Sequence, residues 1–220
     1  MKFNGFPEEF INFLLSLQFL NTTELLPENK ISYKKMISEP LASLHSQLTP
    51  AALEVSESII TKPSKCISTM YNDMRFSKGA PLKDYMYLRF REPFSEKDAL
   101  ELYFDMGYTH YSYGIRIYKQ TSPGMEKIRT AILKNQKAFL AELKKLSDSD
   151  IVIYGANFAK DRYPDISNEM IKSLLNKKNF YIGREHDISP VVHCSDLADE
   201  IADAYQALRG IYLLLKKALY

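Results

Sequence analysis

The first 60 residues carry apolar side chains at helical spacing. Near the start they recur every three or four positions, which is typical of one face of an amphipathic helix: Phe10, Phe13, Leu14, Leu17 and Leu20. A similar pattern runs from about Pro40 to Ile59. We therefore expect residues 1–60 to be mostly helical.

Between residues 64 and 120 the hydrophobic period changes to two, which predicts β-strands. Apolar and polar side chains alternate in "DYMYLRF", in "ALELYFDM" and in "YSYGIRIYK", and "CISTMYN" is a further candidate strand. Short polar links separate these runs. This order favours an antiparallel meander that packs one face on helices.

Helical patterns return in residues 122–220, with one or two further strands. Ser122-Pro123 begins a predicted long helix that continues to Leu146, and a last helix is expected from about Ser195. "IVIYG" and "NFYIG" are the additional strand candidates. The sequence thus predicts one α+β domain over residues 1–220, with N-terminal and C-terminal helices around an antiparallel sheet of about four or five strands.

The composition argues against several classes of partner. With 29 basic and 27 acidic residues the chain is too close to neutral to favour unspecific nucleic-acid binding. The opening apolar run "FINFLLSLQFL" is too short to span a bilayer. It also lacks the Lys/Arg-rich polar face of helices that lie on a membrane surface, so we expect no membrane association. Two distant cysteines, Cys66 and Cys194, fit free thiols and a cytoplasmic location. The oligomeric state stays open.

Metal and cofactor signatures are also missing from the sequence. "REHDISPVVHCSD" contains several possible ligands, but their spacing matches no zinc template. The chain has no P-loop, no G-x-G-x-x-G and no G-x-S-x-G motif. We expect neither a metal nor a cofactor.

The second face of the predicted sheet is the main candidate site. It combines aromatic and charged side chains, which suit a polar ligand. A basic loop, "NDMRFSKGAPLK", leads into its first strand. Together they supply the candidate ligand-binding residues Asp73, Arg75, Lys78, Lys83, Tyr87, Arg89, Tyr103 and Arg116.

Two structural alternatives stand beside this hypothesis. The face could be a solvated surface in which arginines pair with Glu101 and Asp105 across strands. The loop could be a turn in which Asp73 caps backbone N–H groups and Phe76 covers the core edge.

The loop and several other segments resemble an uncharacterised bacterial family, domain of unknown function 2461. The family signature runs Arg-x-x-Arg-Asp-x-Arg-Phe, followed by Ser-Lys-Asp-Lys-x-Pro-Tyr-Lys. The matching residues are Asp73, Arg75, Phe76, Ser77 and Lys78, with Pro81 and Lys83 after a gap of two residues. Further likeness lies in "NTTELLPENKISYKKMISEPL", with Asn21, Asn29, Lys30, Tyr33 and Pro40 in the family's places, and in "GMEKIRTAI" and "EIADAYQALRGIYLLLKKAL". The resemblance implies a fold and a site location, but no reaction.

The chain departs from the family pattern at several positions. Thr69 and Asn72 stand in place of arginines, Leu82 replaces a tyrosine, and Leu25-Leu26 replace a Trp-Phe pair. The chain thus resembles a diverged member, in which a function that needs the full set of arginines would be altered or lost.

The leading hypothesis from the sequence is binding of a small anionic molecule by the loop and the Tyr/Arg face. The first alternative is an enzyme of unknown reaction in which Asp73 or a tyrosine, Tyr87 or Tyr103, acts as acid or base. The second is a protein-interaction module that presents the tyrosines to a partner.

Overall fold

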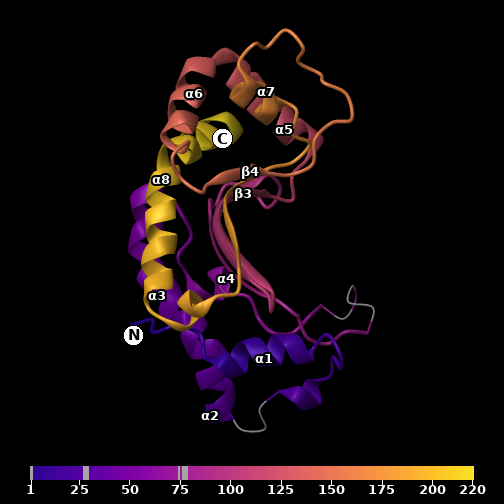
Figure 1. Cartoon of the computed structure of the whole chain (residues 1–220), viewed down its shortest axis with the longest axis vertical. Helices are drawn as coiled ribbons and strands as arrows, with labels where there is room; N and C mark the ends of the chain where they lie inside the picture. The colour runs from indigo at the N-terminus through magenta and orange to yellow at the C-terminus, as the bar shows by residue number, and fades with distance from the viewer. Residues whose placement is uncertain (1, 27–29, 74, 76–78) are drawn as a thin grey trace.

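The fold is built on an antiparallel sheet. In the computed structural model, which describes residues 2–26, 30–73, 75 and 79–220, five strands pair in the order β1-β2-β3-β5-β4 (Figure 1). Their bounds are β1 Met86–Arg91, β2 Ala99–Met106, β3 His110–Tyr118, β4 Val152–Tyr154 and β5 Tyr181–Asp187. Every neighbouring pair in this sheet is antiparallel.

The register places the alternating apolar residues on one face. Leu88 of β1 lies opposite Phe104 of β2, and Phe104 lies opposite Tyr113 of β3. All three side chains are fully buried. The period of two in the sequence therefore identifies the core face, as side chains alternate across a strand.

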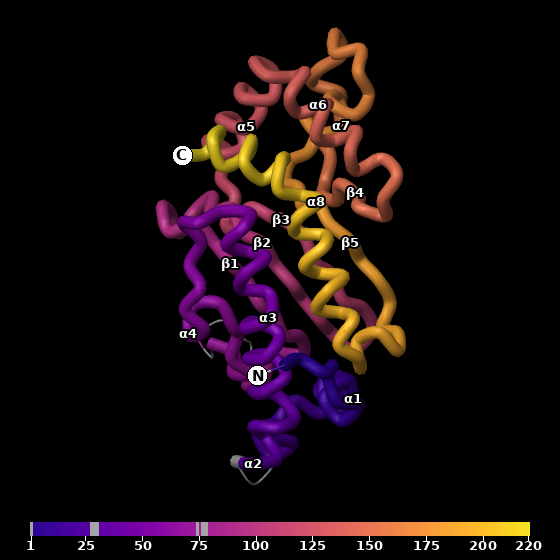
Figure 2. The backbone as a smooth tube through the Cα atoms, turned by 90° about the vertical axis from the view of Figure 1, so that its left-hand side faces the viewer, coloured from indigo at the N-terminus to yellow at the C-terminus, as the bar shows by residue number. Residues whose placement is uncertain are grey.

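Two helices cover this face. α3 (Glu39–Val55) and α8 (Asp196–Leu219) lie side by side across it in both views (Figures 1 and 2). Tyr205 and Tyr212 of α8 are completely buried, as core packing predicts. Acidic residues crowd the first turn of α8 and Lys216 and Lys217 its last, an arrangement that complements the helix dipole.

The remaining helices gather at the two ends of the sheet (Figure 1). α5, α6 and α7 lie at one end beside the C-terminal part of α8, and α1 and α2 lie at the other. The bounds are α1 Glu8–Ser16, η1 Thr23–Leu25, α2 Lys30–Tyr33, η2 Lys34–Ser38, α4 Pro63–Cys66, α5 Ser122–Lys134, α6 Gln136–Lys145, α7 Glu169–Leu175 and η3 Pro190–His193. Within the described residues, no helix lies over the second face of the sheet (Figures 1 and 2).

Three details differ from the expectations. The helix expected from Ser122 to Leu146 is broken at Asn135, where the backbone leaves the helical conformation (φ −129°, ψ 35°) and the side-chain Nδ2 donates to the carbonyl of Ala131. The first helix ends at Ser16, although its apolar pattern continues to Leu20.

Residues 66–72 form no named strand in the described part of the chain. They make only isolated bridges, Ile67 with Leu88 and Tyr71 with Leu82. The α+β class and the antiparallel sheet are confirmed, whereas the domain boundaries stay a prediction. Among the described helices, none has the length and hydropathy needed to cross a bilayer.

Candidate functional site

The second face of the sheet carries the polar residues that the alternation placed there. Tyr87 lies opposite Asp105, Arg89 opposite Tyr103, and Glu101 opposite Arg116. The structure therefore brings four of the candidate ligand-binding residues onto one face: Tyr87, Arg89, Tyr103 and Arg116.

Arg116 is held by two carboxylates on the neighbouring strand. Its Nε donates to Glu101 Oε1 at 2.5 Å, and its Nη1 donates to Asp105. The Glu101 side chain is 0% exposed and that of Arg116 is 18% exposed, so this network is largely shielded from water. Cross-strand pairing was the structural alternative for this face, but the pairs are more buried than a solvated surface implies.

Burial shapes the ionisation of this network. Desolvation raises the pKa values of Glu101 and Asp105, with the positive charge of Arg116 acting in the opposite direction. Desolvation also raises the pKa of Tyr103, whose ring lies 4.5 Å from the guanidinium carbon of Arg116. Arg116 thus faces two carboxyl groups whose ionised forms are favoured by its charge and opposed by burial.

Arg89 is held differently from Arg116. Its guanidinium carbon lies 5.0 Å from the ring centroids of both Tyr87 and Tyr118. No carboxylate among the described residues lies within ion-pair distance of it. Lys119 continues this row, with its ammonium nitrogen 5.3 Å from the Tyr118 ring.

The loop residues lie apart from this face network. Arg75 donates from Nε and Nη2 to the Asp73 carboxylate at 2.9 and 2.6 Å, and their side chains are 80% and 46% exposed. The hydrogen bonds from Arg75 lower the pKa of Asp73. Asp73 also accepts from the backbone N–H of Arg75, which matches the turn alternative. Lys78, Phe76 and Ser77 lie outside the described residues.

Two family-matching residues, Asn21 and Lys83, brace the base of this loop together with Asn72, which departs from the family pattern. Asn21 accepts from the N–H of Leu82 and donates to its carbonyl, at 3.0 and 2.9 Å. Asn72 donates to the same carbonyl and to that of Ala80. Lys83 donates from Nζ to the carbonyls of Thr69 and Tyr71, both at 2.6 Å, so its ammonium group is engaged by the backbone.

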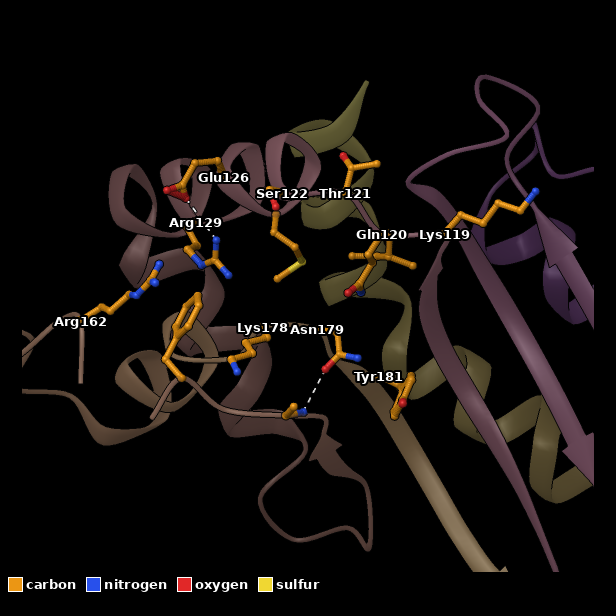
Figure 3. Close-up of a pocket in the computed structure, with 14 residues that line it drawn as sticks. Lys119, Gln120, Thr121, Ser122, Glu126, Arg129, Arg162, Lys178, Asn179 and Tyr181 are labelled. Carbon is orange, nitrogen blue, oxygen red and sulfur yellow. Dashed lines mark hydrogen bonds and ion pairs between the residues drawn. The ribbon is translucent and has the colours of Figure 1, made fainter. Parts of the chain in front are cut away.

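A cavity of about 780 Å³ lies beyond the end of β3 (Figure 3). We call it the basic pocket, because it is lined by four basic side chains and a single acidic one. Its charged lining residues are Lys119, Arg129, Arg162, Lys178 and Glu126. Its uncharged lining residues are Ile117, Gln120, Thr121, Ser122, Met125, Ala156, Phe158, Asn179 and Tyr181.

Two segments distant in sequence are joined to build one wall of the pocket. The backbone of residues 156–158 bonds to that of residues 176–178, through Phe158 N to Asn176 O at 2.9 Å and Lys178 N to Ala156 O at 2.7 Å. Asn179 Oδ1 accepts from the N–H of Ala156 at 2.9 Å. This wall is therefore formed before any ligand arrives.

Gly155 makes the close approach of these two segments possible. Its φ is +121°, and a Cβ atom there would lie 2.0 Å from the carbonyl oxygen of Asn179. Only glycine fits this conformation without strain.

The basic residues of the pocket differ in how they are engaged. Arg129 is buried and donates to the carbonyls of Leu175 and Lys177, at 3.2 and 2.8 Å, and it pairs with Glu126 at 3.2 Å. Arg162 and Lys178 have no carboxylate within ion-pair distance in the described part of the chain. Two positive charges at this wall therefore lack a compensating partner.

A carboxylate of the protein, that of Asp98, already binds at the N-terminus of α5. Asp98 accepts from the N–H of Thr121 at 2.6 Å and from its hydroxyl at 2.7 Å. A Cβ atom on Gly124 would lie 2.2 Å from the same carboxylate. The positive end of this helix is thus neutralised by the protein itself.

The sequence analysis missed this pocket, and none of the eight candidate residues lines it. Its basic residues come from the turn after β3, from α5, from the segment after β4 and from the segment before β5. No sequence motif or regular spacing connects these segments. The only signal in the sequence is the basic character of Lys177-Lys178 and of the polar stretch around Arg162.

The histidines occupy sites of other kinds. His110 is exposed and its Nδ1 lies 2.8 Å from the Thr109 hydroxyl. His186 lies 3.8 Å from Asp150, which also pairs with Arg184. The described residues contain no group of three or more His, Cys, Asp or Glu side chains suited to a metal.

Comparison with protein families identifies the chain. The sequence model of the family described as "Conserved hypothetical protein (DUF2461)" matches residues 9–213. The chain belongs to this family. A search of curated proteins found no match. The DUF2461 match covers the sheet, both groups of helices and the basic pocket.

Proposed function

We propose that this DUF2461 protein binds a small anionic molecule, with the basic pocket as the binding site. The observation that carries the proposal is the cluster of Arg129, Arg162 and Lys178, with Glu126 as the acidic lining residue, on one side of the cavity. Arg162 and Lys178 supply positive charge that no carboxylate in the described residues compensates. Arg129 lies beside them and is held in place by its hydrogen bonds to two backbone carbonyls. The volume of the basic pocket lies within the range of small-molecule sites.

The sheet face is assigned a supporting role in this proposal. Arg116 already has two carboxylates, Lys83 donates to backbone carbonyls, and Arg75 lies against Asp73 at the surface. The row formed by Arg89, Tyr118 and Lys119 leads from this face to the pocket. Direct ligand contacts by the loop and the face remain predictions from the sequence.

The proposal includes no reaction. Asp73, the candidate base, is exposed and does not line the basic pocket. Burial raises the pKa of Tyr103, which makes it a weaker proton donor at neutral pH. The enzyme and the interaction module stay alternatives from the sequence. A cytoplasmic location is part of the proposal and is supported by the two free cysteines.

The test is thermal unfolding of the wild type, Arg162→Gln and Lys137→Gln with a panel of phosphate, sulfate and carboxylate compounds. Lys137 is an exposed lysine outside the pocket, so its variant controls for the loss of one positive charge. A ligand at a hundred times its Kd adds about 2.7 kcal/mol to the free energy of unfolding. We expect this gain in the wild type and the control, and a loss of most of it in Arg162→Gln. The proposal is wrong if no anion stabilises the wild type.

A further inference from the structure

The basic pocket has more room than an inorganic ion fills and is uneven in its charge. A volume of about 780 Å³ compares with about 30 Å³ for one water molecule. In Figure 3, Arg129, Arg162, Lys178 and Glu126 lie on one side, and Gln120, Thr121 and Tyr181 lie on the other. The Lys119 ammonium group points away from the basic side (Figure 3). A ligand that fills the pocket therefore combines an anionic group with an uncharged remainder.

The basic side suits a group with about two negative charges. Glu126 compensates Arg129, whereas Arg162 and Lys178 have no carboxylate within ion-pair distance in the described part of the chain. Arginine offers a planar fork of donors and lysine a mobile point charge, and both bind phosphate. A phosphomonoester carries about −1.5 to −2 charges at pH 7, whereas one carboxylate carries only −1.

The start of α5 does not compete for this anionic group. Asp98 already occupies the N–H and hydroxyl of Thr121, so a second anion there would meet a carboxylate. The charged group is thereby directed to the Arg162 and Lys178 side.

The uncharged side offers neutral hydrogen-bonding groups. Asn179 uses Oδ1 for the N–H of Ala156, which leaves its NH₂ group for other acceptors. Gln120 donates from Nε2 to the carbonyl of Phe180, and its Oε1 is buried without a donor among the described residues. Ser122 adds a hydroxyl at the exposed start of α5. A mixture of neutral donors and acceptors matches hydroxyl groups, which act as both.

We infer that the ligand of the basic pocket is a phosphomonoester of a hydroxyl-bearing small molecule, of the sugar-phosphate class. This inference rests on the proposed function. The phosphate binds Arg162 and Lys178, and the hydroxyl groups face Ser122, Asn179 and the Tyr181 ring, which is 39% exposed.

Isothermal titration calorimetry separates the inference of a sugar phosphate from the proposal that the pocket binds an anion. The sugar-phosphate probes are ribose 5-phosphate, glucose 6-phosphate and glycerol 3-phosphate, and the comparison probes are ribose, inorganic phosphate, phenyl phosphate and succinate. We expect at least one sugar phosphate to bind ten times more tightly than every comparison probe. Tighter binding of succinate, or equal binding of inorganic or phenyl phosphate, overturns the inference but keeps anion binding. If no anion binds, the proposed function fails as well.

Two variants identify the contacts. Lys178→Gln is expected to weaken binding of the best sugar phosphate and of inorganic phosphate by tenfold or more. Ser122→Ala is expected to weaken the sugar phosphate several-fold and to leave inorganic phosphate unchanged, since the Ser122 hydroxyl makes no hydrogen bond with other described residues. Equal loss of both probes in Ser122→Ala contradicts the assigned hydroxyl side.

Discussion

The guanidinium carbon of Arg162 lies 3.6 Å from the centroid of the Phe158 ring. Arg129 approaches the same ring, with its guanidinium carbon at 5.0 Å. Phe158 is itself fixed by the hydrogen bond from its N–H to the carbonyl of Asn176. The ring therefore positions Arg162 at the wall of the basic pocket, where no carboxylate in the described residues holds it.

Replacing Phe158 by leucine tests this positioning. A cation–π contact at a partly exposed site contributes about 0.5–1 kcal/mol. We expect Phe158→Leu to weaken binding of the anion about two- to fivefold, because Arg162 loses its ring but keeps its charge. Calorimetric Kd values of the variant and the wild type give the result. A loss as large as that of Arg162→Gln would show that the ring contributes more than positioning.

Arg129 is expected to matter for stability more than for binding. Its side chain donates to the carbonyls of Leu175 and Lys177, so Arg129→Met leaves two carbonyl groups without their donor. An unsatisfied buried group costs about 1–3 kcal/mol, and we expect a loss of about 2–4 kcal/mol in the free energy of unfolding. Urea unfolding measures it. Arg162→Gln is the control, with an expected loss of at most about 1 kcal/mol, because it gives up the contact with the Phe158 ring but no buried hydrogen-bond partner.

The network on the sheet face predicts a pH dependence of stability. Burial raises the pKa of Glu101 above its ordinary value of 4.5, with Arg116 opposing the shift. The folded protein thus binds this proton more tightly than the unfolded chain. The contribution of this protonation to the free energy of unfolding is fully present below about pH 4.5. It is lost as the pH rises through the pKa of Glu101 in the folded protein.

Glu101→Gln removes this titration. We expect the free energy of unfolding of the variant, relative to wild type, to increase between pH 4.5 and pH 8. Chemical unfolding at several pH values measures this difference, with Glu96→Gln as a control at an exposed position. A difference that decreases with pH would mean that attraction to Arg116 dominates over burial.

Gly155 links the backbone conformation to the shape of the pocket. Because its φ is +121° and a Cβ atom would contact the carbonyl of Asn179, Gly155→Ala is expected to cost about 1–3 kcal/mol of stability. It should also weaken anion binding, since the wall that carries Lys178 would shift. Gly107→Ala is the control, because its nearest neighbour would lie at 3.8 Å. Similar unfolding curves for the two variants would refute the close approach.

The sheet could be predicted because alternation is a local property of the sequence. Leu88, Phe104 and Tyr113 occupy the core face as their spacing indicates. The same alternation placed Arg116 and Glu101 on the second face. Their burial could not be predicted, because it depends on the cross-strand ion pairs and on the Tyr103 ring that the guanidinium covers.

The basic pocket could not be predicted because its residues share no local pattern. Arg129, Arg162 and Lys178 meet only after the segment that follows Gly155 pairs with residues 176–179. The break at Asn135 was missed for a related reason, since the hydrophobic period does not record the bond from the Asn135 side chain to the carbonyl of Ala131. Loop residues that close a site have to be found in the structure.

The central claim is that the anion binds in the basic pocket and not at the loop. Its most direct test is an NMR titration of the arginine side-chain Nε–H resonances with the tightest-binding anion, with Arg162→Gln and Arg75→Ala to assign the two signals. The account predicts a progressive shift of the Arg162 resonance and no shift of the Arg75 resonance. Movement of Arg75 while Arg162 stays unchanged would contradict it and return the site to the loop.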